Sequence, residues 1–258
     1  MNVALILAGG VGRRMGANVP KQFIEVLGKP IIAYTLEIFE KNKNIDAAVV
    51  VCVHGYEEQV QQIVQKYALS KVRWITQGGD TFQESVYKGL LFLQDKCSPD
   101  DIVMIHMSVA PFIDDEIIDD ALKVCMEKGN SISKNECLLC MGSRDTDEYS
   151  TKSVLRENII GLNTPQTFYL GELLSDYVQA DNEGYLYSLE PHTTSLEYHL
   201  GKTLYFSKGS QLNIKITNQD DLDLFEAFWI MKQRRTEKKE YSSMASCGMS
   251  VSEEAILL

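Results

Sequence analysis

The first half of the chain alternates between short apolar runs and amphipathic segments. Residues 3–7 and 47–53 are unbroken apolar runs, the pattern of strands that are buried on both faces of a sheet. The segments between such runs carry apolar residues at helical spacing. The pattern predicts strands at residues 3–7, 47–53, 71–76 and 101–106, and helices at residues 30–39, 56–67, 83–94 and 114–128.

Strands that alternate with helices predict an α/β fold of the Rossmann-like, doubly wound type, with a mostly parallel sheet and crossover helices. Ligands of such sheets bind at the carboxyl ends of the strands. Residues that directly follow a predicted strand are therefore the first candidates for a functional site.

The second half of the chain does not continue this alternation of strand and helix patterns. Residues 142–163 are polar, without a helical or strand period, and long for a connection, so we interpret them as an extended arm. Residues 233–258 are rich in charge and serine, which predicts a flexible polar tail after a single domain of residues 1–232. Regular structure resumes after the arm at residues 164–168. The pattern then predicts a helix at residues 171–179, strands at residues 203–206 and 213–217, and a last helix at residues 219–232.

Composition narrows the possible partners and compartment. The chain of 258 residues has a net charge of −11, which argues against nucleic acid and membrane surfaces, so any anion site must be a local basic pocket. No apolar run reaches the length of a membrane span, and the amino terminus leads directly into a strand, so we expect a cytoplasmic protein. Cys137 and Cys140 have no second cysteine pair to complete a zinc site, and we expect the scattered cysteines to be small buried residues.

A glycine-rich segment follows the first predicted strand. Residues 9–12 include three glycines, which let the backbone approach a ligand, and amides in such a turn suit a polyphosphate. The segment is not a Walker A loop, because Lys21 lies too far from the glycines, nor a dinucleotide fingerprint, because Met15 occupies the third glycine position. A Gly-Gly turn can also be a plain strand-to-helix connection, but the added charges of Arg14 and Lys21 favour a nucleoside triphosphate site.

Two further segments fall on the same edge of the predicted sheet. Gly78-Gly79-Asp80 precedes the helix at residues 83–94, and residues 107–112 follow the strand at residues 101–106. The carboxyl ends of parallel strands meet at one edge, so these segments and the first glycines can converge on one site.

The order of several such blocks resembles the cytidylyltransferases that make CDP-methylerythritol, and even more their ribitol-5-phosphate cytidylyltransferase relatives. The resemblance covers nearly everything from residue 3 to about residue 232. The blocks are Leu7-Ala8-Gly9-Gly10-x-Gly12-x-Arg14-Met15 with Pro20-Lys21-Gln22, Gly78-Gly79-Asp80 with Ser85-Val86, Arg144-Asp145-Thr146, Arg156 ahead of Thr164-Pro165-Gln166, and Asn213-Ile214-Lys215-Ile216-Thr217.

This resemblance implies transfer of CMP from CTP to a polyol or sugar phosphate, with release of pyrophosphate. The attacking phosphate monoester has a second pKa of about 6, so its oxygen is already ionised and no general base is required. Positioning and preorganised cations then supply most of the catalysis. A Mg²⁺ ion that bridges triphosphate oxygens is expected.

The resemblance also implies roles for individual residues. The implied CTP-binding residues are Leu7, Ala8, Gly9, Gly10, Gly12, Gly78, Gly79, Asp80, Ser85 and Ser108. The implied catalytic cations are Arg14, Lys21, Arg156 and Lys215, and the implied acceptor-binding residues are Thr146, Arg156, Thr164 and Lys215. In the family the arm reaches across a dimer, which implies a homodimer whose Thr146 and Arg156 serve the neighbouring site. Taken singly, Lys215 and Arg156 are equally compatible with solvated surface residues.

The chain departs from the family pattern on the acceptor side. Met107 and Ala110 replace an aspartate and an arginine, and Phe82 replaces an arginine that usually follows the second glycine turn. Asp147-Glu148 replaces an apolar-then-basic pair, and residues 192–195 replace an acidic segment. These changes leave the CTP half intact, so we hypothesise a CTP-dependent transferase, most like ribitol-5-phosphate cytidylyltransferase, whose acceptor can differ from both methylerythritol phosphate and ribitol phosphate.

Other interpretations stay open. One is 2-C-methyl-D-erythritol 4-phosphate cytidylyltransferase of isoprenoid synthesis. Another is a catalytically weak CTP-binding homologue, which Met107, Ala110 and Phe82 favour and the retained cations disfavour. A sugar-1-phosphate nucleotidyltransferase would share the opening glycine block, but the later blocks fit it poorly.

Overall fold

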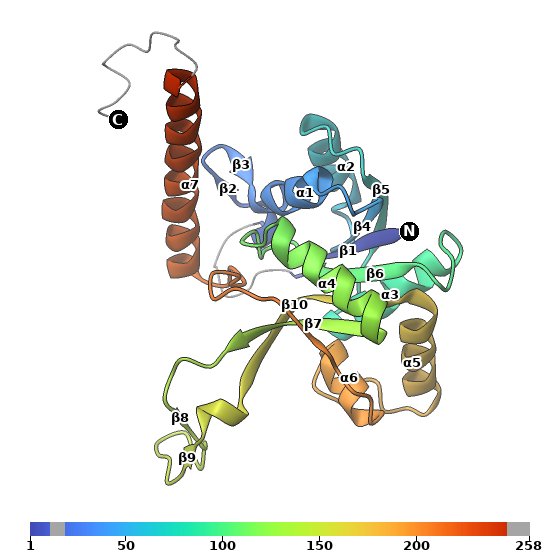
Figure 1. Ribbon diagram of the computed structural model, residues 1–258. Coiled ribbons are helices and arrows are strands. Elements are labelled where there is room, and N and C mark those ends of the chain that lie inside the picture. The colour runs from blue at the N-terminus through green and yellow to red at the C-terminus, as the bar shows by residue number, and fades with distance from the viewer. Residues whose placement is uncertain (11–18, 247–258) are drawn as a thin grey trace. The chain divides into compact units, whose positions relative to one another are not determined.

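The computed structural model describes residues 1–10 and 19–246, with side chains described as far as residue 235 (Figure 1). It contains two compact units, Met1–Lys215 and Ile216–Leu258. The predicted roles of Gly12 and Arg14 lie outside the described residues.

The centre of the first unit is a seven-stranded sheet with the strand order β11-β7-β10-β6-β1-β4-β5 (Figure 1). Strand β1 (Asn2–Ala8) lies between β4 (Ala47–Cys52) and β6 (Ile102–Met107), and β5 (Val72–Gln77) continues the parallel array beside β4. Every residue of β4 is buried, as expected of a strand covered on both faces. The apolar runs therefore predicted these strands correctly.

Helices cover both faces of this sheet. Residues of β1 alternate between two apolar clusters: Ala4 and Ile6 pack with α1, α2 and α4, whereas Leu5 and Leu7 pack with α3 and α5. This two-sided packing confirms the doubly wound α/β fold. The helices are α1 (Ile31–Lys41), α2 (Glu57–Lys66), α3 (Phe82–Gln94), α4 (Asp115–Lys128) and α5 (Leu170–Asn182).

The second half of the chain makes the sheet mixed. Strand β10 (Ile160–Tyr169) is antiparallel to both of its neighbours, β6 and β7 (Asn130–Glu136). The apolar pattern did not predict β7, because most of its residues are polar. The short β11 (Phe206–Ser207) pairs with β7 at the end of the predicted strand at residues 203–206.

Beyond the sheet, β7 and β10 continue into a projection that covers the predicted arm (Figure 1). The projection contains the small hairpin of β8 (Met141–Gly142) and β9 (Ser153–Val154), followed by the 3₁₀ helix η3 (Arg156–Asn158). Cys137 is half-buried and Cys140 is exposed here, so the expectation of buried cysteines was wrong for this pair, although Cys52 and Cys125 are buried.

The sequence pattern failed at two places near the end of the first unit. Residues 213–217 do not form the predicted strand, and helix α6 (Thr193–His199) was not predicted. In the second unit, helix α7 (Gln219–Ser246) continues past the predicted end at residue 232. The remaining short elements are η2 (Lys21–Phe23) and the β2–β3 hairpin (Glu25–Val26 and Lys29–Pro30). Within the described part of the chain, no helix has the length and apolar character needed to cross a membrane.

Candidate active site

Three segments that follow parallel strands meet at the carboxyl edge of the sheet. Backbone hydrogen bonds extend the strand ladders into these segments. The Gly78 amide donates to the Cys52 carbonyl at 2.8 Å, and the Ser108 amide donates to the Leu7 carbonyl at 3.0 Å. The start of the first glycine segment, the second glycine turn and Ser108 are therefore neighbours, as the sheet topology predicted.

Ser85 joins the two glycine segments. A Cβ atom on Gly9 or on Gly78 would lie 3.0 Å or 2.9 Å from the Ser85 hydroxyl oxygen, so both backbones pass directly against this side chain. The hydroxyl accepts a hydrogen bond from the Gly79 amide at 3.0 Å and donates to the Thr81 carbonyl at 2.9 Å. Ser85 is buried and thus fixes the spacing of the two turns at the sheet edge.

The second glycine turn is also locked to the start of α3. Thr81 caps the helix by accepting a hydrogen bond from the Glu84 amide at 3.0 Å, and the Glu84 carboxylate accepts one from the Asp80 amide at 2.8 Å. This backbone hydrogen bond lowers the pKa of Glu84, so the carboxylate stays charged. A Cβ atom on Gly79 would lie only 2.3 Å from that side chain, so the turn requires glycine there.

A cation that was not among the predicted site residues also lies at this turn. The Lys88 ammonium group is 3.0 Å from the Glu84 carboxylate and donates to the Gly78 carbonyl at 3.2 Å. Its position one helical turn after Glu84 is a signal that the sequence contained, since oppositely charged residues at this spacing pair on a helix.

Lys21 lies close to the end of β1 because its neighbour anchors the chain there. The Gln22 side chain donates to the Ala8 carbonyl at 2.7 Å, and both Gln22 and Lys21 are buried. The position of Lys21 therefore suits the predicted contact with a triphosphate.

The segment after β6 is held by neutral hydrogen bonds. His106 is fully buried, and its Nε2 atom lies 2.9 Å from the Ala110 carbonyl oxygen. Burial lowers the pKa of His106 to about 4, so the imidazole is neutral near pH 7. The Thr35 hydroxyl donates to the Ser108 carbonyl at 2.8 Å. His106 thus positions the loop that contains Ser108 and Ala110.

On the acceptor side, paired asparagines hold the predicted Lys215 block against β10. The Asn213 amide group donates to the Thr164 carbonyl at 2.6 Å, and the Asn163 amide group donates to the Asn213 carbonyl at 2.7 Å. Thr164 is buried, and its hydroxyl has no hydrogen-bond partner among the described atoms. These side-chain bonds hold Asn213, two residues before the exposed Lys215, against β10 without the strand that the sequence predicted.

The arm places Thr146 and Arg156 away from the glycine segments of the same chain. The Thr146 hydroxyl accepts hydrogen bonds from the Glu148 and Tyr149 amides, and the Arg156 guanidinium donates to the Leu138 carbonyl at 3.5 Å. Figure 1 shows the arm projecting from the sheet, away from β1. Within one chain, the structure does not bring these two predicted residues to the other candidates.

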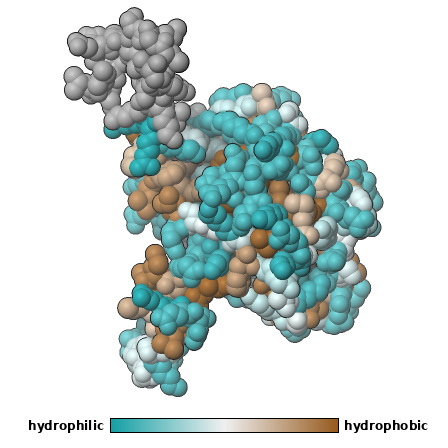
Figure 2. Space-filling view, in the orientation of Figure 1, coloured by the Kyte–Doolittle hydropathy of each residue, from teal (hydrophilic) through white to brown (hydrophobic). Residues whose placement is uncertain are grey.

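Apolar side chains gather on the same projection (Figure 2). Leu138, Leu139 and Leu155 are all about two-thirds exposed or more, at 66%, 74% and 66%. Contiguous exposed apolar residues are typical of interaction surfaces.

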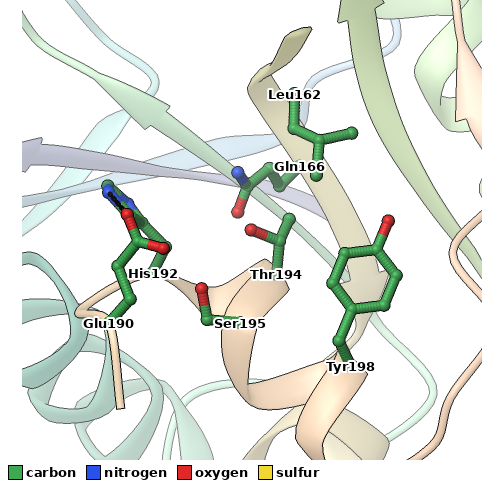
Figure 3. Close-up of a pocket in the computed structure, with 7 residues that line it drawn as sticks. All are labelled: Leu162, Gln166, Glu190, His192, Thr194, Ser195 and Tyr198. Atoms are coloured by element: carbon green, nitrogen blue, oxygen red, sulfur yellow. Dashed lines mark ion pairs between the residues drawn. The ribbon is translucent and has the colours of Figure 1, made fainter. Parts of the chain in front are cut away.

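A pocket of about 380 Å³ lies beside β10 (Figure 3). The Phe82 and His192 rings are in contact, with centroids 5.4 Å apart, so the pocket borders the start of α3 and hence the second glycine turn. Its lining was not predicted, because most of it belongs to α6 and the preceding loop, where no helix was expected. The lining residues are Leu162, Gln166, Glu190, His192, Thr194, Ser195 and Tyr198.

Metal-ligating side chains do not cluster in the described part of the chain. No group of three or more histidine, cysteine, aspartate or glutamate side chains is placed there to hold a metal ion. The described residues therefore offer no such cluster for a metal ion.

Comparisons with known proteins point to one protein family. The family model of 2-C-methyl-D-erythritol 4-phosphate cytidylyltransferase (IspD) matches residues 2–233. A ribitol-5-phosphate cytidylyltransferase of Lacticaseibacillus paracasei is 38% identical over 231 residues, which cover 88% of this chain and 97% of that protein. A 2-C-methyl-D-erythritol 4-phosphate cytidylyltransferase of Clostridium acetobutylicum is 34% identical over 223 residues, which cover 86% of this chain and 94% of that protein.

The fold has close relatives among solved structures. The crystal structure of a 4-diphosphocytidyl-2C-methyl-D-erythritol synthase from Anaerococcus prevotii matches with a TM-score of 0.74. The match covers 89% of this chain and 98% of that chain, at 22% identity. This likeness supports the mixed, mostly parallel sheet described above.

Proposed function

The chain belongs to the 2-C-methyl-D-erythritol 4-phosphate cytidylyltransferase family, and from this premise we propose that it transfers CMP from CTP to the phosphate of a polyol or sugar phosphate, most like ribitol 5-phosphate. The products are a CDP-alcohol and pyrophosphate. Relatives named for ribitol 5-phosphate reach 38% and 37% identity, whereas those named for methylerythritol 4-phosphate reach 35%, and this margin is the support for ribitol 5-phosphate.

The observation that carries the proposal is the junction at Ser85. Gly9, Gly78 and Gly79 meet around one buried hydroxyl at the carboxyl edge of the sheet, where a nucleotide of a doubly wound fold binds. The start of the first glycine segment, at Gly9 and Gly10, suits the phosphates, and the turn at Gly78 to Asp80 suits the base. Lys21 provides a cation beside the first segment.

The chemistry needs no protein base. The attacking phosphate oxygen is already ionised near pH 7, so the side chains have to position two polyanions and balance their charge. The neutral, buried His106 fits this requirement, because it holds a loop and carries no charge to the site. We assign the charge-balancing roles to Lys21 and Lys215, and to Arg156 supplied by a second chain.

Family members generally use a divalent metal ion, and we propose Mg²⁺ as the ion that accompanies CTP. The described residues offer no cluster of ligating side chains, so the phosphate oxygens of the nucleotide are the ligands we expect. We derive no catalytic step from the ion.

We further propose a homodimer in which each arm reaches the site of its partner. The apolar surface of the arm and the distance of Thr146 and Arg156 from their own glycine segments both support this arrangement. The cytidylyltransferase domain would then comprise residues 1–232.

The direct test is release of pyrophosphate from CTP and Mg²⁺ with purified protein. Ribitol 5-phosphate, methylerythritol 4-phosphate and a panel of other polyol and sugar phosphates are supplied one at a time. We expect turnover with ribitol 5-phosphate or a related polyol phosphate. Comparable turnover with methylerythritol 4-phosphate would contradict the acceptor assignment, and no turnover with any acceptor would contradict the proposed function.

One observation favours a second candidate, a catalytically weak CTP-binding homologue. Ala110 is fully buried and Phe82 packs on His192, at two positions where the resemblance implies arginine. Calorimetry separates the candidates: CTP binding without turnover on any acceptor supports the weak homologue.

A further inference from the structure

Every amide of the second glycine turn, residues 78–80, already has an acceptor inside the protein. The acceptors are the Cys52 carbonyl for Gly78 at 2.8 Å, the Ser85 hydroxyl for Gly79 at 3.0 Å and the Glu84 carboxylate for Asp80 at 2.8 Å. An amide N–H carries a single proton, so these three donors are taken. The backbone of the turn therefore presents a ligand with acceptors.

The Gly79 carbonyl is the acceptor on the side of the nucleotide. Its oxygen lies 3.8 Å from the position of a Cβ atom on Gly9, and so lies toward the first glycine segment. The hydrogen bond that it accepts from the Ser85 hydroxyl is long, at 3.3 Å, and a carbonyl oxygen has two lone pairs. It can thus accept from the amino group of cytosine, whereas uracil carries a carbonyl oxygen in the same position.

Lys88 and Glu84 tie the two ends of this turn together. The Lys88 ammonium group donates to the Gly78 carbonyl at 3.2 Å and lies 3.0 Å from the Oε1 atom of Glu84. The Oε2 atom of Glu84 accepts from the Asp80 amide. This amide, followed by Lys88, lowers the pKa of Glu84, so the carboxylate is charged near pH 7. One ion pair therefore connects the first residue of the turn to the last.

This ion pair is suited to shaping the turn rather than to stabilising the fold. The Lys88 and Glu84 side chains are 46% and 24% exposed, and exposed pairs contribute little to the free energy of unfolding. Without Lys88, the carboxylate loses the cation that holds it over the turn, and without Glu84 the Asp80 amide loses its acceptor. A released amide is a donor, and a donor beside the base favours uracil over cytosine.

We propose that the pair of Lys88 and Glu84 determines which base the enzyme accepts. The pair closes a clamp from the Gly78 carbonyl to the Asp80 amide, keeps that amide turned away from the base, and so makes the turn selective for cytosine over uracil. The inference rests on the proposed function and deepens it. Both side chains act through the turn, so they are positioning residues.

The test is the preference for CTP over UTP, measured as the ratio of the two kcat/KM values for pyrophosphate release. Wild type, Lys88→Met, Glu84→Met and the double variant are assayed with Mg²⁺ and the acceptor that gives the fastest turnover. We expect the ratio to fall about tenfold in Glu84→Met and about fivefold in Lys88→Met, the range of one hydrogen bond. The double variant should be no worse than Glu84→Met, because both changes break one clamp. The KM for the acceptor should stay unchanged.

Two variants separate this role from a general loss of structure. Lys88→Arg keeps a cation at this position, so it should keep the wild-type ratio. Lys123→Met removes an exposed cation from α4, on the other face of the sheet, and should also keep the ratio. A Lys88→Met protein with the wild-type ratio, even one with lower activity toward both nucleotides, contradicts the inference and leaves the proposed function standing.

A wild-type protein that releases no pyrophosphate with any acceptor contradicts the proposed function. The clamp is then judged by calorimetry, as the ratio of the dissociation constants for UTP and CTP. A ratio that does not differ between wild type and Lys88→Met contradicts the inference, and so does a wild type that binds neither nucleotide.

Discussion

Glu197 of α6 carries a buried carboxyl group. Only 1% of the residue is exposed, and its Oε1 atom has no partner among the described atoms. Asp176 and Glu172 approach from α5, and the Lys202 ammonium pairs with Asp176. Burial, followed by the charge of Asp176, raises the pKa of Glu197 from 4.5 to about 8. The folded protein therefore keeps this carboxyl protonated near pH 7.

This protonation predicts a stability that falls as the pH rises. Between pH 4.5 and about 8, folded Glu197 holds a proton that the unfolded chain has lost, so the free energy of unfolding decreases by up to about 1.4 kcal/mol per pH unit. His106 acts in the opposite direction between its folded pKa of about 4 and its ordinary value of 6.5. The clearest window is therefore pH 6.5 to 8. Urea unfolding measures this effect. In the wild type the free energy of unfolding should fall as the pH rises from 6.5 to 8, and in Glu197→Gln this fall should be absent.

The control for this experiment is Glu183→Gln, an exposed residue at the end of α5. It should keep the wild-type slope. An unfolding free energy that is flat from pH 6.5 to 8 in the wild type would contradict the protonated state of Glu197.

At the scale of elements, the start of α3 is set by the glycine turn before it. An alanine at position 79 would place its Cβ atom 2.3 Å from the Glu84 side chain, whose carboxylate would have to leave the Asp80 amide. We expect Gly79→Ala to raise the KM for CTP at least about tenfold and to lower stability by about 1–3 kcal/mol through overpacking. Steady-state kinetics and thermal unfolding measure both effects.

Gly161→Ala is the matched control for this substitution. A Cβ atom there meets its nearest neighbours at 3.6 Å and 3.7 Å, an ordinary contact distance, so the KM for CTP should not change. An unchanged KM in Gly79→Ala would show that the second glycine turn does not contact the nucleotide.

The elements that the sequence predicted well share one property: the pattern of apolar residues within each element is enough to identify it. β1 and β4 are continuous apolar runs, and their burial on two faces leaves no other arrangement. β7 was not predicted, because its sequence is mostly polar and it is held in the sheet by pairing with β10 and β11. Residues 213–217 have a strand-like sequence but form no strand. Asn213 is held by a side-chain hydrogen bond to the Thr164 carbonyl, and not by the backbone hydrogen bonds of a sheet.

The same distinction applies to the candidate site. The topology alone brings together the segments after β1, β5 and β6, so Gly9, Gly78 and Ser108 could be placed from sequence. Gln166 and Glu190 could not be placed as pocket residues, because their convergence depends on α6 and on the antiparallel β10. The assigned roles of Lys21, Lys215 and Arg156 stay predictions until kinetics test them.

At the scale of the whole molecule, the proposed dimer makes a prediction about which chain supplies Arg156. If the arm serves the partner, a mixed dimer of Arg156→Ala and Lys215→Ala has one site with both changes and one site with neither. Both side chains are exposed, so their removal should leave each chain folded. Variants that are each nearly inactive alone should regain activity when mixed, since every mixed dimer contains one intact site.

The size of the recovery follows from random pairing. An equimolar mixture that exchanges subunits contains about one half mixed dimers, and half of their sites are intact, so activity should reach about a quarter of the wild-type value. Lys152→Ala, another exposed arm cation, mixed with Lys215→Ala gives the control, because Lys152→Ala should be active before mixing. Pyrophosphate release after mixing, together with the mass of the particle in solution, decides the question. An arm that serves its own chain leaves no intact site in any mixed dimer, and the mixture would then stay as inactive as its components.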